Sequence, residues 1–273
     1  MHRVARPGRF AEATVRSLKR LAVAGTLALG TLSLAGAPAS ADAAKPAAMT
    51  PAQKAEIEKI IRAYILENPE VLFEAIEVHK KRQQSKQEEA HKKLIVARAK
   101  EIFRSPGDFV FGNPKGDITV VEFFDYNCGW CKRALAEVVK LTKSDPKVRV
   151  VFKEFPVFGG EDSVFAAKAA IAAKMQGKYF EYHTALMKER RVTKDVALKV
   201  AQRVGLDVAK LKGDMEKPEV EAVIQGNVQT GHSLGIEGTP GFIVDTKVIP
   251  GFIPGSAFQQ LLADIRKKGC QTC

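Results

Sequence analysis

Four cysteines form two Cys-x-x-Cys pairs, Cys128/Cys131 and Cys270/Cys273. The first pair, in Cys128-Gly129-Trp130-Cys131, follows an apolar run and precedes an amphipathic segment, so we expect it where a strand ends and a helix begins. Unpaired N–H groups and partial positive charge at a helix N-terminus stabilise a thiolate there, and Lys132 and Arg133 add positive charge. The two-residue gap lets the sulfurs bond across the first helical turn. The pair therefore predicts thiol–disulfide exchange, with Cys128 exposed and Cys131 further inside.

Two other interpretations compete for these cysteines. A purely structural disulfide within Cys128–Cys131 would close a four-residue loop and would constrain the unfolded chain little. A zinc site would use both pairs, but they are much further apart than the roughly 15–20 residues between the pairs of a zinc ribbon. The five histidines show no metal-binding spacing, so we predict no metal site and no cofactor. For Cys270/Cys273 an accessory disulfide is favoured over a regulatory dithiol or a soft-metal clamp.

The segments around the first pair predict an α/β fold. Residues 118–124 and 148–155 are expected to be strands and residues 131–143 the helix between them, an order that makes the two strands parallel neighbours. The remaining expectations are a helical region at 162–232, a hairpin of 242–244 with 248–249, and a last helix at 256–268.

The N-terminus has the pattern of a secretory signal peptide, residues 1–41. A basic region is followed by a short apolar run and by small residues in an A-x-A arrangement. An uncleaved membrane anchor is the alternative, but the run is short against the ~20 residues that a span needs. We expect a mature chain that begins near Asp42 in a bacterial-type periplasm.

Residues 42–105 are predicted to be a helical oligomerisation segment and linker. Thr50-Pro51 is a helix start, and Ile57, Ile60, Ile61 and Tyr64 repeat at helical spacing. Asn68-Pro69 restarts the helix. No large apolar residue occurs at 80–93, which predicts a solvated helix or a flexible linker. Because short amphipathic helices must bury their apolar faces, we expect a homo-oligomer through residues 50–78. The alternative is that these helices fold back on their own catalytic domain.

Composition and charge exclude several classes of protein. Hydrophobic residues make up 45% of the 273 residues and charged residues 27%, which permits a buried core. Polytopic membrane proteins, collagens and low-complexity scaffolds are excluded. The net charge is +12, and it falls to about +7 without residues 1–41, which carry six basic residues and one acid. The basic residues are dispersed and the chain is expected to be exported, so we predict no nucleic-acid partner.

Three segments resemble the DsbA-type bacterial thiol–disulfide oxidoreductases, over about residues 108–268. They are the active-site segment 121–133, the segment Gly238-Thr239-Pro240-Gly241-Phe242, and residues 176–183 of the predicted helical region. The N-terminal helices, with Leu66-Glu67-Asn68-Pro69-Glu70, resemble those of suppressor-of-copper-sensitivity C proteins and related oligomeric members.

This resemblance implies a thioredoxin fold at 106–269 with a helical insertion at about 160–232, followed by the Cys pair at 270–273. It makes Cys128 the attacking cysteine and Cys131 the resolving one. Pro240 matches a cis-proline beside the disulfide, and Thr239 presents backbone groups to a bound peptide. Glu122 matches a buried acid that accepts protons from Cys131, although it also fits an ordinary acid in a strand.

The dipeptide Gly129-Trp130 departs from the Pro-His of the strong oxidases, whose histidine helps to stabilise the thiolate. We therefore expect a milder oxidant and favour a disulfide isomerase or reductase. Its expected partners are disulfide-containing exported proteins and a membrane redox partner. A DsbA-like dithiol oxidase is the alternative within the class. A Cu(I)-binding copper-tolerance protein, with Cys128 and Cys131 as soft ligands, is the alternative from another class.

Overall fold

The computed structural model describes residues 49–273, so the predicted signal peptide lies outside the described residues. The chain divides into two units, residues 1–62 and residues 63–273, which are treated separately below. In the first unit, the described residues form the start of α1 (Pro51–Glu67). This helix begins where Thr50-Pro51 predicted, and Gln53 N donates a hydrogen bond to Thr50 Oγ1.

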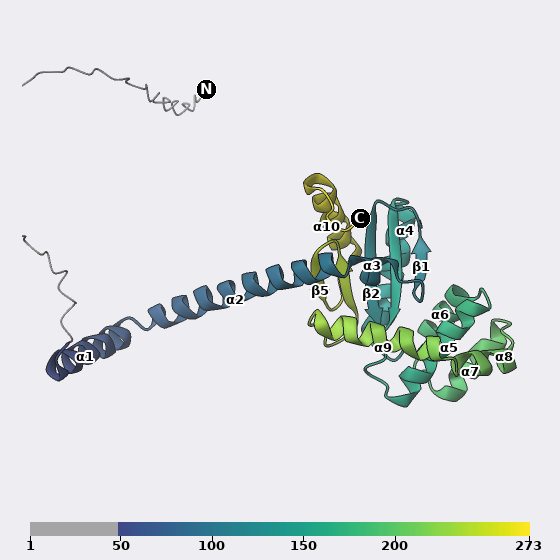
Figure 1. Cartoon of the computed structure of the whole chain (residues 1–273), viewed down its shortest axis with the longest axis horizontal. Coiled ribbons are helices and arrows are strands. Elements are labelled where there is room, and N and C mark those ends of the chain that lie inside the picture. Colours follow the sequence, from purple (N-terminus) through teal and green to yellow (C-terminus); the bar gives the residue numbers. More distant parts are fainter. Residues whose placement is uncertain (1–48) are drawn as a thin grey trace, which may run out of the picture. The chain divides into compact units, whose positions relative to one another are not determined.

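The second unit is built on a five-stranded sheet with the strand order β1-β3-β2-β4-β5 (Figure 1). The parallel pairing of β2 (Ile118–Phe124) with β3 (Val148–Glu154) confirms the predicted neighbours. The other pairs are antiparallel, and the predicted hairpin is β4 (Gly241–Val244) with β5 (Lys247–Pro250). The sequence did not predict the edge strand β1 (Phe109–Gly112), because four residues are too short to show a period.

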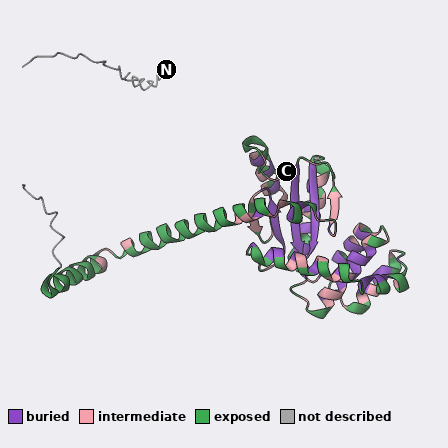
Figure 2. Cartoon of the chain, viewed as in Figure 1, coloured by how far each residue is buried: buried purple, intermediate pink, exposed green. Residues whose placement is uncertain are grey.

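Helices cover both faces of this sheet. On one face, α4 (Gly129–Ser144) and α10 (Gly255–Lys268) pack against side chains of β2, β3 and β4 such as Val120, Val150 and Val244. On the other face, α3 (Ala99–Arg104) and the residues after α9 pack against Val121 and Ile243. Figure 2 shows the strands of the sheet as mostly buried between these helices.

The predicted helical insertion lies between β3 and β4. It comprises five helices: α5 (Glu161–Met175), α6 (Tyr179–Lys188), α7 (Lys194–Arg203), α8 (Val208–Met215) and α9 (Pro218–Ser233). The alanine-rich α5 is its central element, since small side chains let α6, α7, α8 and α9 all approach it closely.

The polar stretch 80–93 is helical. It is the middle of α2 (Glu70–Ala97), which begins just after Asn68-Pro69 as predicted. The only buried residue of this helix is Ile95, and Ile95 packs with Ile102 and Phe103 of α3 against the sheet. The structure therefore differs from the predicted boundary near residue 105, because residues 94–104 belong to the core of the sheet domain. No helix among the described residues is long and apolar enough to cross a membrane.

Candidate active site

Cys128 and Cys131 lie at the N-terminus of α4, as the sequence predicts. Cys128 is the residue before the helix, with extended backbone angles, and Cys131 lies in the first turn. Both are free thiols and both are buried, Cys131 completely and Cys128 with 6% of its surface exposed. Cys128 is the more exposed of the two cysteines, as predicted, but only a small part of its surface is accessible to a substrate.

The two thiols have opposite acidities. The pKa of Cys128 is lowered to about 5, first because Cys131 donates a hydrogen bond to it, with Thr239 and the backbone N–H groups of Trp130 and Cys131 adding to the effect against burial. The pKa of Cys131 is raised far above its ordinary value by burial, by its hydrogen bond to Cys128 and by the charge of Glu122. At neutral pH the outer sulfur is therefore the thiolate and the inner sulfur keeps its proton.

Lys132 and Arg133, the basic residues beside the cysteine pair, make their direct contacts away from the sulfur atoms. Lys132 donates hydrogen bonds from Nζ to the backbone oxygens of Glu189 and Arg190 in the helical insertion. Arg133 lies over the ring of Trp130, with its guanidinium carbon 4.9 Å from the ring centre. The hydrogen bonds to Cys128 lower its pKa most, and Lys132 interacts with the thiolate only through its charge.

The loop before β4 faces the thiols. The Thr239–Pro240 peptide bond is cis, as the resemblance implied. The protonated Cys128 Sγ lies 3.1 Å from the backbone oxygen of Thr239 and donates a hydrogen bond to it. The structure thus places Cys128 beside Thr239 and Pro240, although more than a hundred residues separate Cys128 from these two in the sequence.

Glu122 lies in the middle of β2 and is 1% exposed. Alternation along the strand places it on the same face as Val120 and Phe124, the face that α4 covers. Neither carboxyl oxygen has a hydrogen-bond partner. Burial, and then the charge of Cys128, raises the pKa of Glu122 to about 8. An unpaired buried acid of this kind can hold or release a proton near neutral pH.

Trp130 is the exposed side chain of the active-site dipeptide. It is 53% exposed and its ring lies 5.5 Å from that of Phe252, which follows β5. Gly129 is exposed as well, and a Cβ there would meet nothing within 4 Å. Beside the thiols the surface is therefore apolar and open.

Two residues that the sequence analysis missed fix the loop before Cys128. Asp125 accepts hydrogen bonds from Asn127 N, Phe158 N and Ser163 Oγ. Asn127 donates from Nδ2 to Ser163 Oγ and to Val192 O, and accepts from Val192 N. Since Asp and Asn commonly bind backbone groups in turns, their presence after a strand was the available signal.

His183, in α6 of the helical insertion, has a structural role. It is fully buried among Phe124, Phe152 and Tyr179, and burial lowers its pKa to about 3. Glu154 accepts hydrogen bonds from the hydroxyls of Tyr126 and Tyr179. Because the Tyr126 hydroxyl proton is used there, the Nδ1–H of a neutral His183 donates to Tyr126, 3.1 Å away.

Comparison with known proteins assigns this arrangement to a family. A family model described as the DSBA-like thioredoxin domain matches residues 119–265, more than half of the chain. The chain belongs to this DsbA-like family. A second model, the N-terminal domain of the copper resistance protein ScsC, matches residues 53–86. The two matches agree with the expected layout of a thioredoxin-fold oxidoreductase domain preceded by ScsC-like helices.

Solved structures of other DsbA-like and thioredoxin-like proteins are similar to this chain. A thioredoxin-like oxidoreductase from Silicibacter pomeroyi DSS-3 is 47% identical, with a TM-score of 0.60, over 62% of this chain and 97% of that one. BcfH from Salmonella enterica Typhimurium is 27% identical, with a TM-score of 0.67, over 78% and 95%. A periplasmic thioredoxin-like protein from the same organism is 27% identical, with a TM-score of 0.53, over 62% and 95%.

Among curated proteins, the Na(+)/H(+) antiporter NhaA 3 of Salinispora tropica is 29% identical over 140 residues. That match covers 50% of this chain and 22% of the antiporter. The chain spans less than a quarter of the length of the curated relatives that it matches. Among residues 49–273, no group of three or more His, Cys, Asp or Glu side chains is arranged to hold a metal ion.

Proposed function

We propose that this chain is an exported disulfide isomerase or reductase that acts on protein disulfides through Cys128. The observation that carries the proposal is the division of acidity within one DsbA-like active site, with a Cys128 pKa of about 5 beside a protonated Cys131. A thiolate that is populated at neutral pH can attack a disulfide, and a neighbouring thiol can resolve the product.

The first step forms a mixed disulfide. The Cys128 thiolate attacks one sulfur of a client disulfide, the Cys128–client bond forms, and the other client sulfur leaves as a thiolate. In isomerisation, a client thiolate then attacks the mixed disulfide and releases Cys128 unchanged. In reduction, Cys131 attacks Cys128 Sγ instead, so that the client leaves with two thiols and the active site keeps a disulfide.

Glu122 would serve the second step. Cys131 must lose a proton before it attacks, and its raised pKa opposes that loss. The Glu122 carboxyl, buried on the strand face beneath α4 and without a hydrogen-bond partner, would take the proton. With a pKa of about 8, Glu122 is mostly protonated at neutral pH, so the ionised minority accepts the proton, and that carboxylate is a stronger base than an ordinary glutamate.

Thr239, Pro240 and Trp130 would receive the client. The Thr239 backbone oxygen lies against Cys128 Sγ, where a client strand could pair with it beside the reacting sulfur. The exposed ring of Trp130 and the half-buried ring of Phe252 would bury apolar client side chains. A disulfide enzyme of this kind needs apolar contact, since incorrectly bridged proteins expose their cores.

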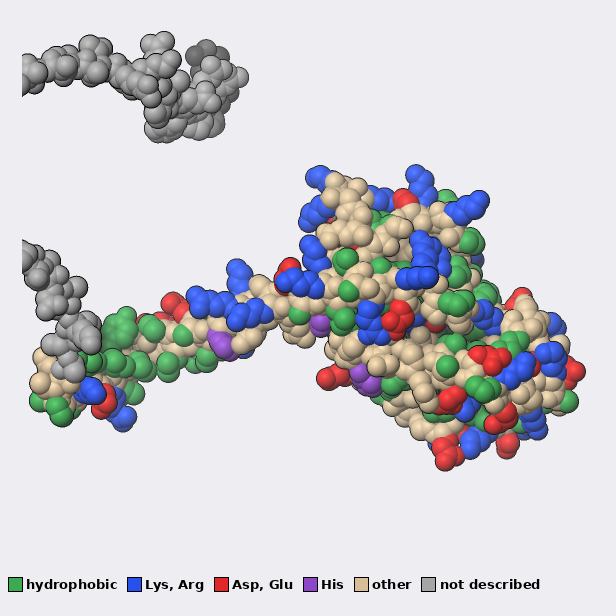
Figure 3. Space-filling model, viewed as in Figure 1, with side chains coloured by type: hydrophobic (Ala, Val, Ile, Leu, Met, Phe, Trp, Pro, Cys, Tyr) green, Lys and Arg blue, Asp and Glu red, His purple; other side chains and the backbone are tan. Residues whose placement is uncertain are grey.

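We propose export to the periplasm and a homo-oligomer formed through residues 50–78. The signal-peptide pattern of residues 1–41 and the likeness to a periplasmic thioredoxin-like protein support the location. The exposed apolar side chains of α1 and α2 support the oligomer. They include Ile60, Ile61, Tyr64, Leu72 and Phe73, each at least 47% exposed. Figure 3 shows hydrophobic side chains at the surface of both helices.

The preference for isomerase or reductase activity over oxidation rests on Gly129-Trp130, which places no histidine beside the thiolate. The lowered pKa of Cys128 favours the dithiol form, which an isomerase needs and which also suits a dithiol oxidase. A dithiol oxidase remains the alternative within the family. The copper-binding alternative rests on Cys128 and Cys131 alone, because Cys270 and Cys273 are bonded to each other.

The test is reactivation of a scrambled-disulfide client by the pre-reduced mature chain. We expect recovery that Cys128→Ser abolishes and that Cys131→Ser converts into trapped covalent client complexes. Activity retained by Cys128→Ser would contradict the mechanism. Oxidation of a reduced client without reactivation of a scrambled one would favour the oxidase, and stoichiometric Cu(I) uptake without turnover would favour the copper protein.

A further inference from the structure

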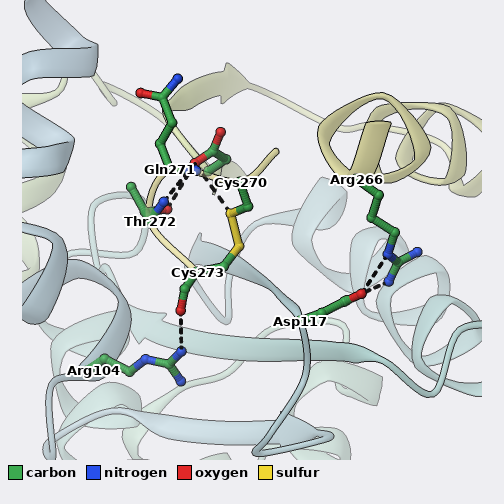
Figure 4. The surroundings of a disulfide bond; sticks show 8 residues. Arg104, Asp117, Arg266, Cys270, Gln271, Thr272 and Cys273 are labelled. Atoms are coloured by element: carbon green, nitrogen blue, oxygen red, sulfur yellow. Dashed lines mark hydrogen bonds and ion pairs between the residues drawn. A yellow bond between two sulfur atoms is a disulfide. The ribbon is translucent and has the colours of Figure 1, made fainter. Parts of the chain in front are cut away.

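The second cysteine pair lies after the last helix, α10. Cys270 and Cys273 form a disulfide directly after α10, with their Cα atoms 5.7 Å apart (Figure 4). Cys273 is exposed, whereas Cys270 is half-buried and packs against the core cluster that also contains the active-site cysteines. The pair therefore has an outer sulfur and an inner one.

Hydrogen bonds that involve no sulfur hold this terminal loop. Asp245, in the turn between β4 and β5, accepts at Oδ1 from Gln271 N, Thr272 N and Thr272 Oγ1, at 2.8, 3.1 and 3.2 Å. Arg104 donates to the backbone oxygen of Cys273 at 3.4 Å. Because these contacts position both cysteines, the loop can keep its shape when the disulfide is reduced.

The disulfide contributes little as a brace. It closes a loop of only four residues, and the entropy that a disulfide removes from the unfolded chain falls as the loop shortens. Exposed disulfides are also the ones that thiols reach and exchange with. A short, exposed pair on a loop held by other contacts has the features of a reversible redox centre.

The terminal pair and the active-site pair of one chain lie apart. Thr239, beside Cys128, and Asp245, beside Cys270, lie at opposite ends of β4. That strand has four residues and spans roughly 13 Å at the rise of a strand. Because Asp245 and Arg104 hold the terminal loop at its own end of the strand, we take the partner for exchange to be another molecule.

We propose that Cys270/Cys273 is a second redox centre, whose dithiol form reduces the Cys128–Cys131 disulfide of another copy of this chain. The proposal rests on the proposed function, because an isomerase must be returned to its dithiol form whenever Cys131 has released a client. The apolar faces of α1 and α2, which are proposed to join copies of the chain, would keep such a partner at high local concentration.

The exchange between two copies of the chain has two steps. The Cys273 thiolate attacks Cys128 Sγ, a Cys273–Cys128 bond forms, and the Cys128–Cys131 bond breaks with Cys131 taking a proton. Cys270 then loses its proton and attacks Cys273 Sγ, which forms the Cys270–Cys273 disulfide and releases Cys128 as a thiolate. Two electrons pass from the terminal pair to the active site, and a membrane dithiol partner, as expected for this class of enzyme, would return two electrons to the terminal pair.

The low pKa of Cys128 favours electron transfer from the terminal pair to the active-site pair. A thiolate with a pKa of about 5 is a good leaving group, so the dithiol form of the active site is favoured. On the terminal loop, by contrast, the Asp245 carboxylate lies 3.5 Å from Cys270 Sγ and disfavours a thiolate there.

Two full-length mature variants test the exchange. The donor carries Cys128→Ser and Cys131→Ser and is pre-reduced at its terminal pair. The acceptor carries Cys270→Ser and Cys273→Ser and is oxidised at its active site. After mixing, acid quench, alkylation and intact mass are measured. We expect the two thiols to move to the acceptor, with an equilibrium constant on the order of 10 to 100. A donor that keeps its thiols would overturn the proposal and make the disulfide a brace.

Single-cysteine chains identify the attacking sulfur. A chain with Cys273 alone, mixed with a chain whose Cys128 has been activated as an aromatic mixed disulfide, should form a Cys128–Cys273 crosslink. The matched control retains only the half-buried Cys270 and should react about tenfold more slowly, since access controls the rate. Equal rates would contradict the assigned order of attack.

Failure of this proposal differs from failure of the proposed function. The acceptor variant retains the whole active site, so it should reactivate a scrambled client normally when dithiothreitol supplies the electrons. Normal client activity without transfer from the donor would reject only the second redox centre. Loss of client activity in a folded acceptor would reject the proposed function.

Discussion

Cys128 owes its acidity to its partner thiol more than to charged neighbours. Lys132 and Arg133 follow Cys131 in the sequence, but helical geometry directs them to the insertion and to Trp130. The inner thiol is the first contributor to the lowered pKa. A thiolate can thus be stabilised here without the histidine that strong oxidases of the family place between their cysteines.

Removing that thiol should raise the pKa of Cys128. In Cys131→Ala the first hydrogen-bond donor is lost, and we expect an increase of about one unit or more. Cys131→Ser is the matched control, because its hydroxyl can still donate and should give a smaller increase. The rate of Cys128 alkylation as a function of pH measures both, and an unchanged pKa in Cys131→Ala would contradict this origin of the acidity.

Glu122 should make the folded state sensitive to alkali. Its pKa rises from 4.5 to about 8 on folding, so its favourable contribution is complete below pH 4.5 and is lost as the pH rises to 8. Glu122→Gln cannot ionise. We expect the variant to equal the wild type in stability at pH 4 and to exceed it at pH 8.5 by roughly 3–5 kcal/mol. Urea unfolding measures this difference, and parallel stability curves would show that Glu122 does not titrate as described.

Among the elements, those with a clear period were predictable. Both central strands, the helix after Cys128, the helical insertion and the hairpin lie close to their expected positions. The edge strand β1 was missed because only its partner β3 defines it. The role of residues 94–104 was also missed, since the same apolar spacing fits a separate helix or a helix that covers a sheet.

The residues of the candidate active site, like the elements of the fold, were predictable only in part. Cys128, Cys131, Thr239 and Pro240 could be found because their motifs are local in sequence. The bridging role of Asn127 could not, because it depends on Val192 and Ser163 in the insertion. Gly159 is required at the same place, since a Cβ there would lie 2.6 Å from Asn127 Nδ2 and would also overlap Ser163 Oγ.

Asn127→Ala should loosen the connection between the active-site loop and the helical insertion. It removes three side-chain hydrogen bonds and leaves both backbone groups of the buried Val192 unpaired. We expect a loss of about 2–3 kcal/mol in the free energy of unfolding. Asn113→Ala, which removes two bonds in an exposed turn that does not contact the helical insertion, should cost about 1 kcal/mol or less. Equal losses in urea unfolding would show that Asn127 has no special bridging role.

At the scale of the whole molecule, the exposed apolar residues of α1 and α2 predict self-association. Ile61→Glu places a charge on the apolar face of α1, and the lost burial alone should cost about 2 kcal/mol per subunit. Ala55→Glu makes the same charge change on the opposite face of the helix. Light scattering should give a smaller mass per particle for Ile61→Glu only. A wild-type mass of one chain, or equal effects of both variants, would contradict an interface on this face.

A truncation meant to isolate the catalytic domain must retain the N-terminal residues that pack into its core. Removal of residues 42–105 would take away Ile95, Ile102 and Phe103, which cover one face of the sheet. A deletion that ends before Leu94 leaves these side chains in place. The first truncation is therefore expected to unfold, and only the second can report on assembly.

The hydrogen bond from Cys128 to Thr239 has a further consequence for the response to acid. While the sulfur is protonated, it occupies the backbone oxygen with which a client strand would pair. Loss of that proton, at a pKa of about 5, both creates the nucleophile and vacates the acceptor. Ionisation and client docking should therefore favour each other by the same factor. Below pH 5, protonation of Cys128 should therefore lower its reactivity and weaken client docking together.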